Sequence, residues 1–387
     1  MKWLLVTRWV SVLGDRVFSV AVIWSMWSST RSPFATAGVV LAESVPFLLW
    51  AGVRRRLGWL QAWNWLAVND ALRAVLVFAI GSILALGVSV RGLSAVLVLV
   101  ALNSFLTAIY EPAFNAVIPK IAVAATARKR YAVFDLAGRI ARIAGPLIAA
   151  ALLALPSVRY SFYVDAASFA VAGVGIIMSR RLGYSPVTQA GKTSEKTARK
   201  TLPRAARLFV ASNSLAALTG TSWWLAAPML ADRSGGASIL YSVVTATVAV
   251  AGIGTNLLVA KNFSDRRPTR VAAAGWLIVA VCFVLALGPA LVPTVVFAAV
   301  AFGAGTTLSA LSFSFYLADQ DDLVRREILH SEQALTRTVG MIAALFSASL
   351  LSVDYRIGLL LCAVLSFGAL AVAHRASPSP RDLPPIR

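Results

Sequence analysis

Charged side chains are scarce in this chain of 387 residues. Only 13% of the residues are Asp, Glu, Lys or Arg, whereas 59% are hydrophobic, and the mean hydropathy is +0.77. Soluble proteins carry roughly 25% charged and about 45–50% apolar residues. So few charges could not cover the apolar surface of a soluble protein of this size. The composition therefore excludes a cytosolic enzyme, a disordered protein and a disulfide scaffold, and it indicates a polytopic membrane protein.

Cysteine and histidine are also rare, with two residues of each type. Cys282 and Cys362 both lie in long apolar runs, so we expect small buried thiols rather than a disulfide. His330 and His374 are predicted outside the bilayer core. The sequence has no metal-ligand spacing, no phosphate-binding loop and no nucleophile–base arrangement. We therefore expect no enzyme activity, no ATP-driven transport, no metal and no cofactor. The expected energy source is a proton gradient.

Long apolar runs make up most of the chain. A helix needs roughly 20 mainly apolar residues to cross the ~30 Å hydrocarbon core of a bilayer. Runs without the alternating pattern of barrel strands are helical in lipid, because a helix satisfies its own backbone hydrogen bonds. The sequence predicts an all-α membrane protein with twelve transmembrane helices. Their approximate limits are 4–28, 34–53, 65–87, 93–114, 132–155, 160–178, 206–230, 238–260, 270–288, 292–316, 333–353 and 357–374.

A polar stretch at residues 179–205 divides these spans into six and six. Its Ser, Thr and Lys content predicts a flexible cytoplasmic linker. The sequence thus predicts an N-terminal six-helix bundle at 1–178, a C-terminal six-helix bundle at 206–374 and a proline-rich, disordered tail at 375–387. Because each half carries a short basic turn between its second and third spans, we expect two pseudo-symmetric bundles. Such repeats place a binding site between them and work by alternating access.

Basic residues outnumber acidic ones by 36 to 16, and the formal net charge is +20. If the N-terminus is cytoplasmic, most Lys and Arg fall in cytoplasmic loops, as the positive-inside rule requires. We therefore expect a bacterial inner-membrane protein with both termini in the cytoplasm, and a charge that sets topology rather than binding nucleic acid. The loops on the opposite side hold few basic residues, namely Arg31, Arg91, Arg159, Arg233 and Arg356.

Several motifs resemble the major facilitator superfamily over essentially the whole chain. The loop Asn262-Phe-Ser-Asp265-Arg266-Arg267-Pro-Thr-Arg270 resembles the superfamily's cytoplasmic G-x-x-x-D-R-x-x-R-type signature. Its counterpart in the first half keeps Gly52 and three arginines but has no acidic residue. This resemblance implies the two-bundle transporter fold, and a monomer that carries a small-molecule substrate across the lipid bilayer.

Other segments are similar to the macrolide-efflux and enterobactin-exporter-like branch of that superfamily. The run Ala141-Arg142-Ile-Ala-Gly145-Pro146-Leu-Ile-Ala149-Ala150 resembles an antiporter motif, G-x-x-x-G-P-x-x-G-G, with alanine at three glycine positions. The resemblance implies a proton-coupled antiporter that exports a drug, an antibiotic or a siderophore. The other segments that carry it are Leu13-Gly14-Asp15-Arg16-Val17-Phe18, Asn69-Asp70-Ala-Leu-Arg73-Ala74, Glu111-Pro112-Ala113-Phe-Asn-Ala-Val-Ile-Pro119 and Phe162-Tyr-Val-Asp165-Ala-Ala-Ser168-Phe169.

Ionisable residues inside the predicted spans are the sharpest functional candidates, because a charge in hydrocarbon usually faces a cavity or a partner. Glu43 lies near the middle of the second span and Asp15 within the first. Desolvation disfavours the charged form of a carboxyl, and a group that can hold and release a proton is what coupling requires. We assign proton coupling to Glu43 and Asp15, with pairing between helices as the alternative role for each.

The remaining candidates form two groups. Charges that we expect to brace helices or gates are Asp70, Arg73, Glu111, Asp135, Arg139, Asp265, Arg266 and Arg270. Asp165 is expected to cap or brace the outer end of the sixth span. Polar and aromatic side chains can offer hydrogen bonds and flat contact area to a large, partly apolar ligand. The candidate substrate-binding residues are Arg16, Asn103, Arg142, Asn213, Trp223, Trp224, Asn256 and Tyr316.

Other functions stay open at this stage. A symporter that imports a metabolite or a metal–siderophore chelate would share the twelve spans, and so would a lysophospholipid transporter. A membrane-embedded enzyme would need a cluster of His, Asp and Ser at membrane depth, which the sequence lacks. A sensor would need a folded domain outside the membrane, and the longest predicted loop is too short and too polar for one.

Overall fold

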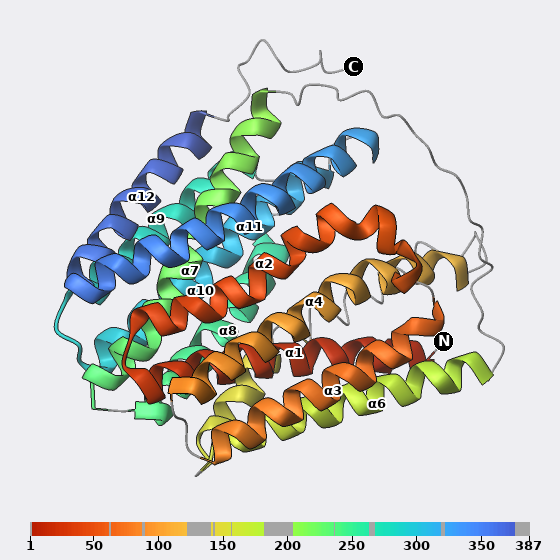
Figure 1. Ribbon diagram of the computed structural model, residues 1–387. Coiled ribbons are helices and arrows are strands. Elements are labelled where there is room, and N and C mark those ends of the chain that lie inside the picture. Colours follow the sequence, from red (N-terminus) through yellow and green to blue (C-terminus); the bar gives the residue numbers. More distant parts are fainter. Residues whose placement is uncertain are drawn as a thin grey trace, which may run out of the picture. The chain divides into compact units, whose positions relative to one another are not determined.

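The computed structural model describes residues 2–61, 63–86, 90–121, 141, 144–155, 157–181, 204–235, 237–262, 268–318 and 322–375. Within these ranges every regular element is a helix (Figure 1). The chain divides into two compact units, Met1–Ser194 and Glu195–Arg387, which we call the amino-terminal and carboxy-terminal units. Each is described by itself.

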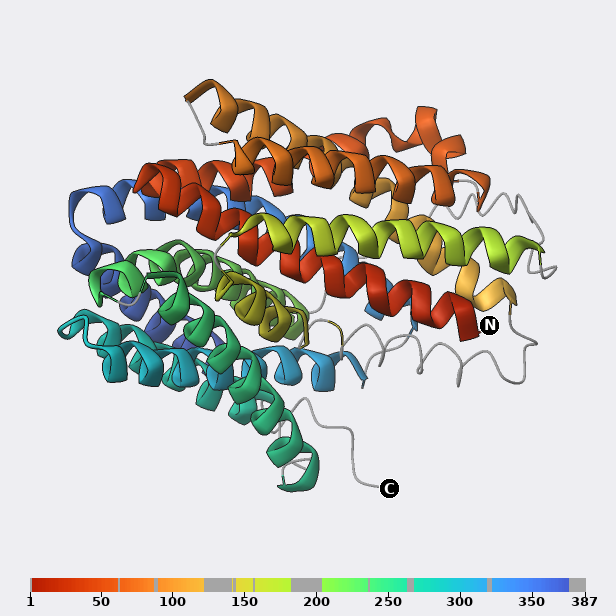
Figure 2. The ribbon, with the colours of Figure 1, turned by 90° about the horizontal axis from the view of Figure 1, so that it is seen from below.

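The amino-terminal unit consists of long apolar helices and two short ones. Its helices α1 and α6 pack together, and α6 also packs against α3, so that the three run side by side (Figures 1 and 2). Helix α4 packs against both α2 and α3. The bounds are α1 (Lys2–Thr30), α2 (Pro33–Leu57), the 3-10 helix η1 (Gly58–Gln61), α3 (Trp63–Ala85), α4 (Val90–Ile121), a short apolar helix (Ala144–Leu153) and α6 (Arg159–Arg181).

The carboxy-terminal unit contains six long helices. Helix α10 packs against α8 and α9, while α7 packs against α11 and α12. The α9–α10 approach is close: a Cβ on Gly275 would lie 2.8 Å from the carbonyl oxygen of Gly305, so only small residues fit there. The bounds are α7 (Arg204–Arg233), α8 (Ala237–Asn262), α9 (Pro268–Leu287), α10 (Val292–Ala318), α11 (Asp322–Val353) and α12 (Tyr355–Arg375).

Ten of the described helices are long and apolar enough to cross a membrane. Helix α7 is long but not among them, because Ser, Thr and Asn residues interrupt its apolar side chains. The predicted fifth span, 132–155, is described only in part, as the helix Ala144–Leu153. The prediction of an all-helical membrane protein is confirmed, and Cys282 and Cys362 are buried free thiols as expected.

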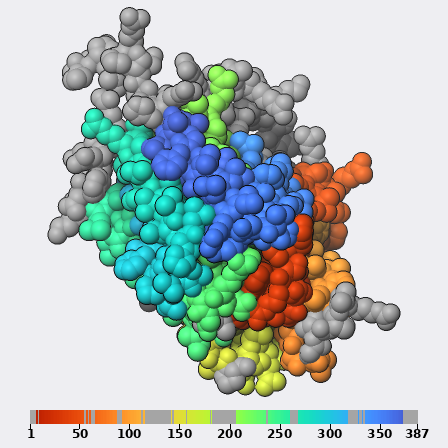
Figure 3. All heavy atoms as spheres, turned by 90° about the vertical axis from the view of Figure 1, so that its left-hand side faces the viewer, coloured from red at the N-terminus to blue at the C-terminus, as the bar shows by residue number. Residues whose placement is uncertain are grey.

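Helices α9 and α12 each present a stripe of apolar side chains to the outside. Figure 3 shows α9 in teal and α12 in dark blue on one face of the molecule. The exposed residues recur every three or four positions, so they lie along one side of each helix. Such a surface is suited to hydrocarbon rather than to water. Its exposed members are Leu277, Val281, Val284, Ile357, Leu360, Val364 and Phe367.

Candidate functional site

A fully buried arginine, Arg73 of α3, lies at the centre of the amino-terminal unit. Its Nη2 forms an ion pair and hydrogen bond with Asp15 of α1, and its Nε donates to the side-chain oxygen of Asn103 of α4 at 3.3 Å. The guanidinium carbon lies 3.8 Å from the centre of the Phe169 ring of α6. One side chain therefore contacts residues from three other helices.

Three carboxyl groups surround this guanidinium. Besides Asp15, Asp70 places Oδ1 3.9 Å from Nη1 of Arg73, and Asp165 of α6 lies near enough to interact with the charges of both Asp15 and Arg73. We call Asp15, Asp70, Asp165 and Arg73 the Arg73 cluster. Among the described residues, no group of three or more His, Cys, Asp or Glu is arranged to hold a metal ion. The Arg73 cluster consists of buried charged side chains. A buried charge in a membrane span is by default a candidate for a functional site.

Asp165 does not cap α6; near that end of the helix its side chain interacts with the charges of Asp15 and Arg73 on two neighbouring helices, which is the bracing alternative expected from the sequence. It lies in the second turn of α6, is fully buried, and accepts a hydrogen bond from Ser168 Oγ at 3.2 Å. Gly14 of α1 makes room for this arrangement, because a Cβ there would collide with Ser168 Oγ and Asp165 Oδ1. A small residue lets the two helices approach closely, which brings Asp15 and Asp165 into one cluster.

The second predicted coupling residue, Glu43 of α2, is half-buried. Its Oε1 accepts a hydrogen bond from Ser19 Oγ of α1 at 3.0 Å. Ser19 and Asp15 are four residues apart and so lie on one face of α1, one turn from each other. The structure thus brings both carboxyls assigned to proton coupling to the same face of a single helix.

Arg16 turns away from its neighbour Asp15. It is exposed, and a Cβ on Gly145 of the short helix Ala144–Leu153 would collide with Arg16 Cβ. Arg16 therefore lies against the described part of the predicted fifth span. Asn103, a candidate for substrate binding, is buried and accepts the hydrogen bond from Arg73, so in this structure it supports the Arg73 cluster.

A carboxyl that the sequence reasoning missed lies in the carboxy-terminal unit. Oε1 of Glu332 accepts hydrogen bonds from Asn213 Nδ2 of α7 at 2.7 Å and from Thr336 Oγ1 at 2.9 Å. The eleventh span was predicted to begin at residue 333, which left Glu332 outside it. Helix α11 begins at Asp322, so Glu332 lies well inside the helix. The four-residue spacing of Glu332 and Thr336 in the sequence could have indicated that both lie on one face of a helix.

Trp223, predicted as a substrate-binding residue, lies in the core of its unit in this structure. Its ring is fully buried, stacked on Phe302 with centres 4.9 Å apart and edge-on to Phe283 at 6.4 Å. Helices α9 and α10 supply these two partners. Trp224 is half-buried and contacts Phe302 edge-on at 6.2 Å. Trp223 therefore fills the space between helices, and Trp224 is the better candidate for a ligand contact.

The other predicted site residues are scattered or not described. Asn256 donates to the carbonyl oxygen of Gly252 in its own helix at 3.1 Å, and Tyr316 stacks on Phe209 with centres 4.3 Å apart. Arg270 is exposed near the start of α9. Outside the described residues are Asp135, Arg139, Arg142, Asp265, Arg266 and the side chain of Glu111.

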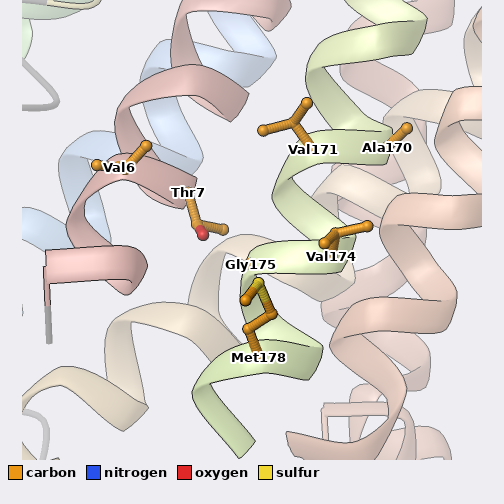
Figure 4. Close-up of a pocket in the computed structure, with 7 residues that line it drawn as sticks. All are labelled: Val6, Thr7, Ala170, Val171, Val174, Gly175 and Met178. Carbon is orange, nitrogen blue, oxygen red and sulfur yellow. The ribbon is translucent and has the colours of Figure 1, made fainter.

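An open groove of about 270 Å³ lies between α1 and α6 (Figure 4). Apart from the Thr7 hydroxyl, its lining is apolar, and several of the side chains are more than 40% exposed. A groove of this character suits a hydrocarbon chain and offers little to orient a polar substrate. We therefore place the candidate site at the Arg73 cluster and Glu43. The groove is lined by Val6, Thr7, Ala170, Val171, Val174, Gly175 and Met178.

Known proteins similar to this chain are transporters. The chain is 25% identical over 321 residues to the uncharacterized MFS-type transporter YvqJ of Bacillus subtilis strain 168, covering 79% of this chain and 75% of the relative. No family model matches. Among solved structures, a bacterial homologue of the iron transporter ferroportin aligns with a TM-score of 0.74 at 14% identity, over 97% of this chain and 98% of the other.

Two further structures show the same likeness. The nucleoside transporter NupG aligns with a TM-score of 0.72 at 14% identity, over 96% and 99% of the two chains. A bacterial homologue of the human lysosomal transporter Spinster aligns with a TM-score of 0.73 at 12% identity, over 97% and 95%. The chain therefore has the fold of the MFS transporters and is a multi-pass membrane protein, and the proteins that it resembles are transporters rather than enzymes.

Proposed function

We propose that this protein is a secondary-active transporter that uses proton influx to export a hydrophobic or amphiphilic small molecule, such as a drug, an antibiotic or a siderophore. The observation that carries this proposal is the gathering of Asp15, Arg73 and Glu43 around one helix, α1. The likeness to MFS-type transporters supports transport. The antiporter-like run from Ala141 to Ala150 supports export.

The geometry around Asp15 supports proton coupling in this proposal. Asp15 is 26% exposed in its side chain while its partner Arg73 is fully buried, so one carboxyl is reachable by solvent and its counter-ion is not. Protonation of Asp15 would release Arg73, and it would break the ion pair that links α1 to α3. Glu43 of α2 accepts a hydrogen bond from the hydroxyl of Ser19, which lies one turn from Asp15 on the same face of α1. Proton binding is thereby linked to helix packing in the amino-terminal unit.

The proposal includes the orientation and assembly expected from the sequence. Both termini lie in the cytoplasm, since the basic loops then follow the positive-inside rule. The protein works as a monomer, with the bilayer and a small molecule as its only partners. It uses the proton gradient rather than a cofactor.

Replacement of Glu43 by glutamine tests the role of this carboxyl. Glutamine keeps the size of the side chain and can still bond to Ser19, but it cannot bind and release a proton. In everted membrane vesicles we expect Glu43→Gln to lose gradient-driven transport down to the level of vesicles without the protein. Binding of the same compound to the purified variant should be unchanged.

The matched control is Asp354→Asn, which neutralises an exposed carboxyl that bonds to the backbone of Arg356. This variant should transport like the wild type. Gradient-driven transport by Glu43→Gln at the rate of the control would contradict a coupling role for Glu43. A loss of both binding and transport would instead indicate that Glu43 binds the substrate.

A further inference from the structure

Oδ2 of Asp165 and Nη1 of Arg73 are buried polar atoms of the Arg73 cluster that form no hydrogen bond with any described residue, and Nη1 lies 3.9 Å from Oδ1 of Asp70. One is an acceptor and the other a donor, both belong to fully buried side chains, and α3 and α6 pack directly against each other. Buried polar groups are almost always bonded, so a complementary unmatched pair calls for an explanation.

The surroundings of Asp165 do not suit a carboxylate. The one hydrogen bond that its side chain accepts in the described structure comes from the neutral hydroxyl of Ser168. The negative charge of Asp15 opposes a second charge nearby, while Arg73, the cation that acts on Asp165 in the described structure, is bound to Asp15. A buried charge without a direct partner is costly, and a neutral acid at the same position costs far less.

We propose that Asp165 holds a proton while Arg73 is paired with Asp15, and that Asp15 and Asp165 alternate as the partner of Arg73 during transport. Asp165 is then a proton-binding site, additional to Asp15 and Glu43. The role of this proton in coupling rests on the proposed function; its presence on Asp165 does not.

The exchange balances in protons and in charge. When the Asp15 carboxylate takes a proton from water, its bond to Arg73 Nη2 is lost. The Asp165 acid gives its proton to water, and its carboxylate then accepts the N–H of Arg73 Nη1. One proton is bound and one released, and the net charge of the cluster is unchanged. Among the described residues, the other charged or titratable groups that face these atoms are Asp70 of α3 and Tyr110 of α4, whose ring centre lies 5.8 Å from the guanidinium carbon.

Infrared spectroscopy of the purified protein in a detergent without ester groups tests this directly, because a protonated carboxylic acid has a C=O stretching band that carboxylates and amides lack. At neutral pH we expect the wild type to show such a band and Asp165→Asn to lack one acid's share of its intensity. Asp354→Asn, the exposed control, should retain the full band. Circular dichroism and thermal unfolding would show that Asp165→Asn is folded.

The alternation is tested by a change on another helix. In Asp15→Asn the guanidinium is no longer held by a carboxylate on α1, so it should pair with Asp165, and the band should be lost although Asp165 is still present. A role for Asp165 in packing alone would leave the band of Asp15→Asn unchanged. A band that persists in Asp165→Asn but disappears in Glu43→Gln would move the proton to Glu43 and overturn the proposal.

These results can be separated from the fate of the transport proposal, because the infrared measurement needs no substrate. If the wild type transports without protons but shows the band of Asp165, then Asp165 binds a proton, but this proton has no role in coupling. If transport is proton-driven but the wild type has no band that depends on Asp165, the proton site is wrong and coupling stays with Glu43 and Asp15.

Discussion

Replacement of Arg73 by alanine is expected to destabilise the amino-terminal unit by about 3–5 kcal/mol, the range measured when one partner of a buried ion pair is removed. The substitution would leave Asp15 without its guanidinium and Asn103 without its donor, and it would remove the cation from the Phe169 ring. For a unit of this size the loss corresponds to a fall in the midpoint of thermal unfolding on the order of 10 °C. A thermal melt of the purified protein in detergent measures it.

Two comparisons make the Arg73 result specific. Arg270→Ala removes an exposed arginine and should change stability by less than about 0.5 kcal/mol, as most surface substitutions do. Arg73→Lys keeps the charge but loses the planar fork and the stacking on Phe169, so it should fall between the wild type and Arg73→Ala. If Arg73→Ala melted at the wild-type temperature, the Arg73 cluster would not be what holds α1, α3, α4 and α6 together.

Replacement of Trp223 by alanine is expected to cost the carboxy-terminal unit about 3–5 kcal/mol, the usual range for removing a large aromatic side chain from a core. The reason is the cavity left beside Phe302 and Phe283, which helices α9 and α10 hold in place. The neighbouring Trp224 is the matched control, because it is half-buried and has a single edge-on contact with Phe302 in the described structure. Trp224→Ala should lower the unfolding midpoint much less.

The same pair separates a packing role from a binding role. Trp223→Ala should reduce the amount of folded protein without changing which compounds the folded fraction binds. Binding titrations normalised to folded protein measure this. A changed ligand preference for Trp223→Ala at an unchanged unfolding midpoint would restore Trp223 to the substrate site and show that its burial in this structure is not its functional state.

The class of protein and most of the membrane spans could be predicted from the sequence, because a membrane span is a local property of roughly 20 residues. It was less reliable where a helix extends beyond its apolar run. Glu332 was placed outside the eleventh span, although α11 begins ten residues earlier. Helix α7 was predicted as a span from its apolar residues; the structure has a helix there, but its Ser, Thr and Asn content keeps it out of the ten helices apolar enough to cross a membrane.

Pairings between helices could not be predicted from local pattern. Asp70 and Arg73 lie three residues apart on α3, yet Arg73 forms its hydrogen-bonded ion pair with Asp15, which lies 58 residues away in the chain. That contact depends on the approach of α1 to α6 at Gly14, a feature of packing rather than of any one segment. Trp223 shows the same limit, since nothing local to α7 distinguishes a tryptophan that faces Phe302 from one that faces a ligand.

The central claim is that substrate and protons cross the membrane in opposite directions. The most direct measurement uses proteoliposomes that contain a pH-sensitive dye and an acidic interior, to which macrolides, siderophores or lysophospholipids are added from outside. We predict that a transported compound discharges the gradient faster, and that Glu43→Gln proteoliposomes do not respond. Uptake of the same compound with no change in internal pH would contradict proton coupling, and uptake that requires protons to enter with it would make the protein an importer.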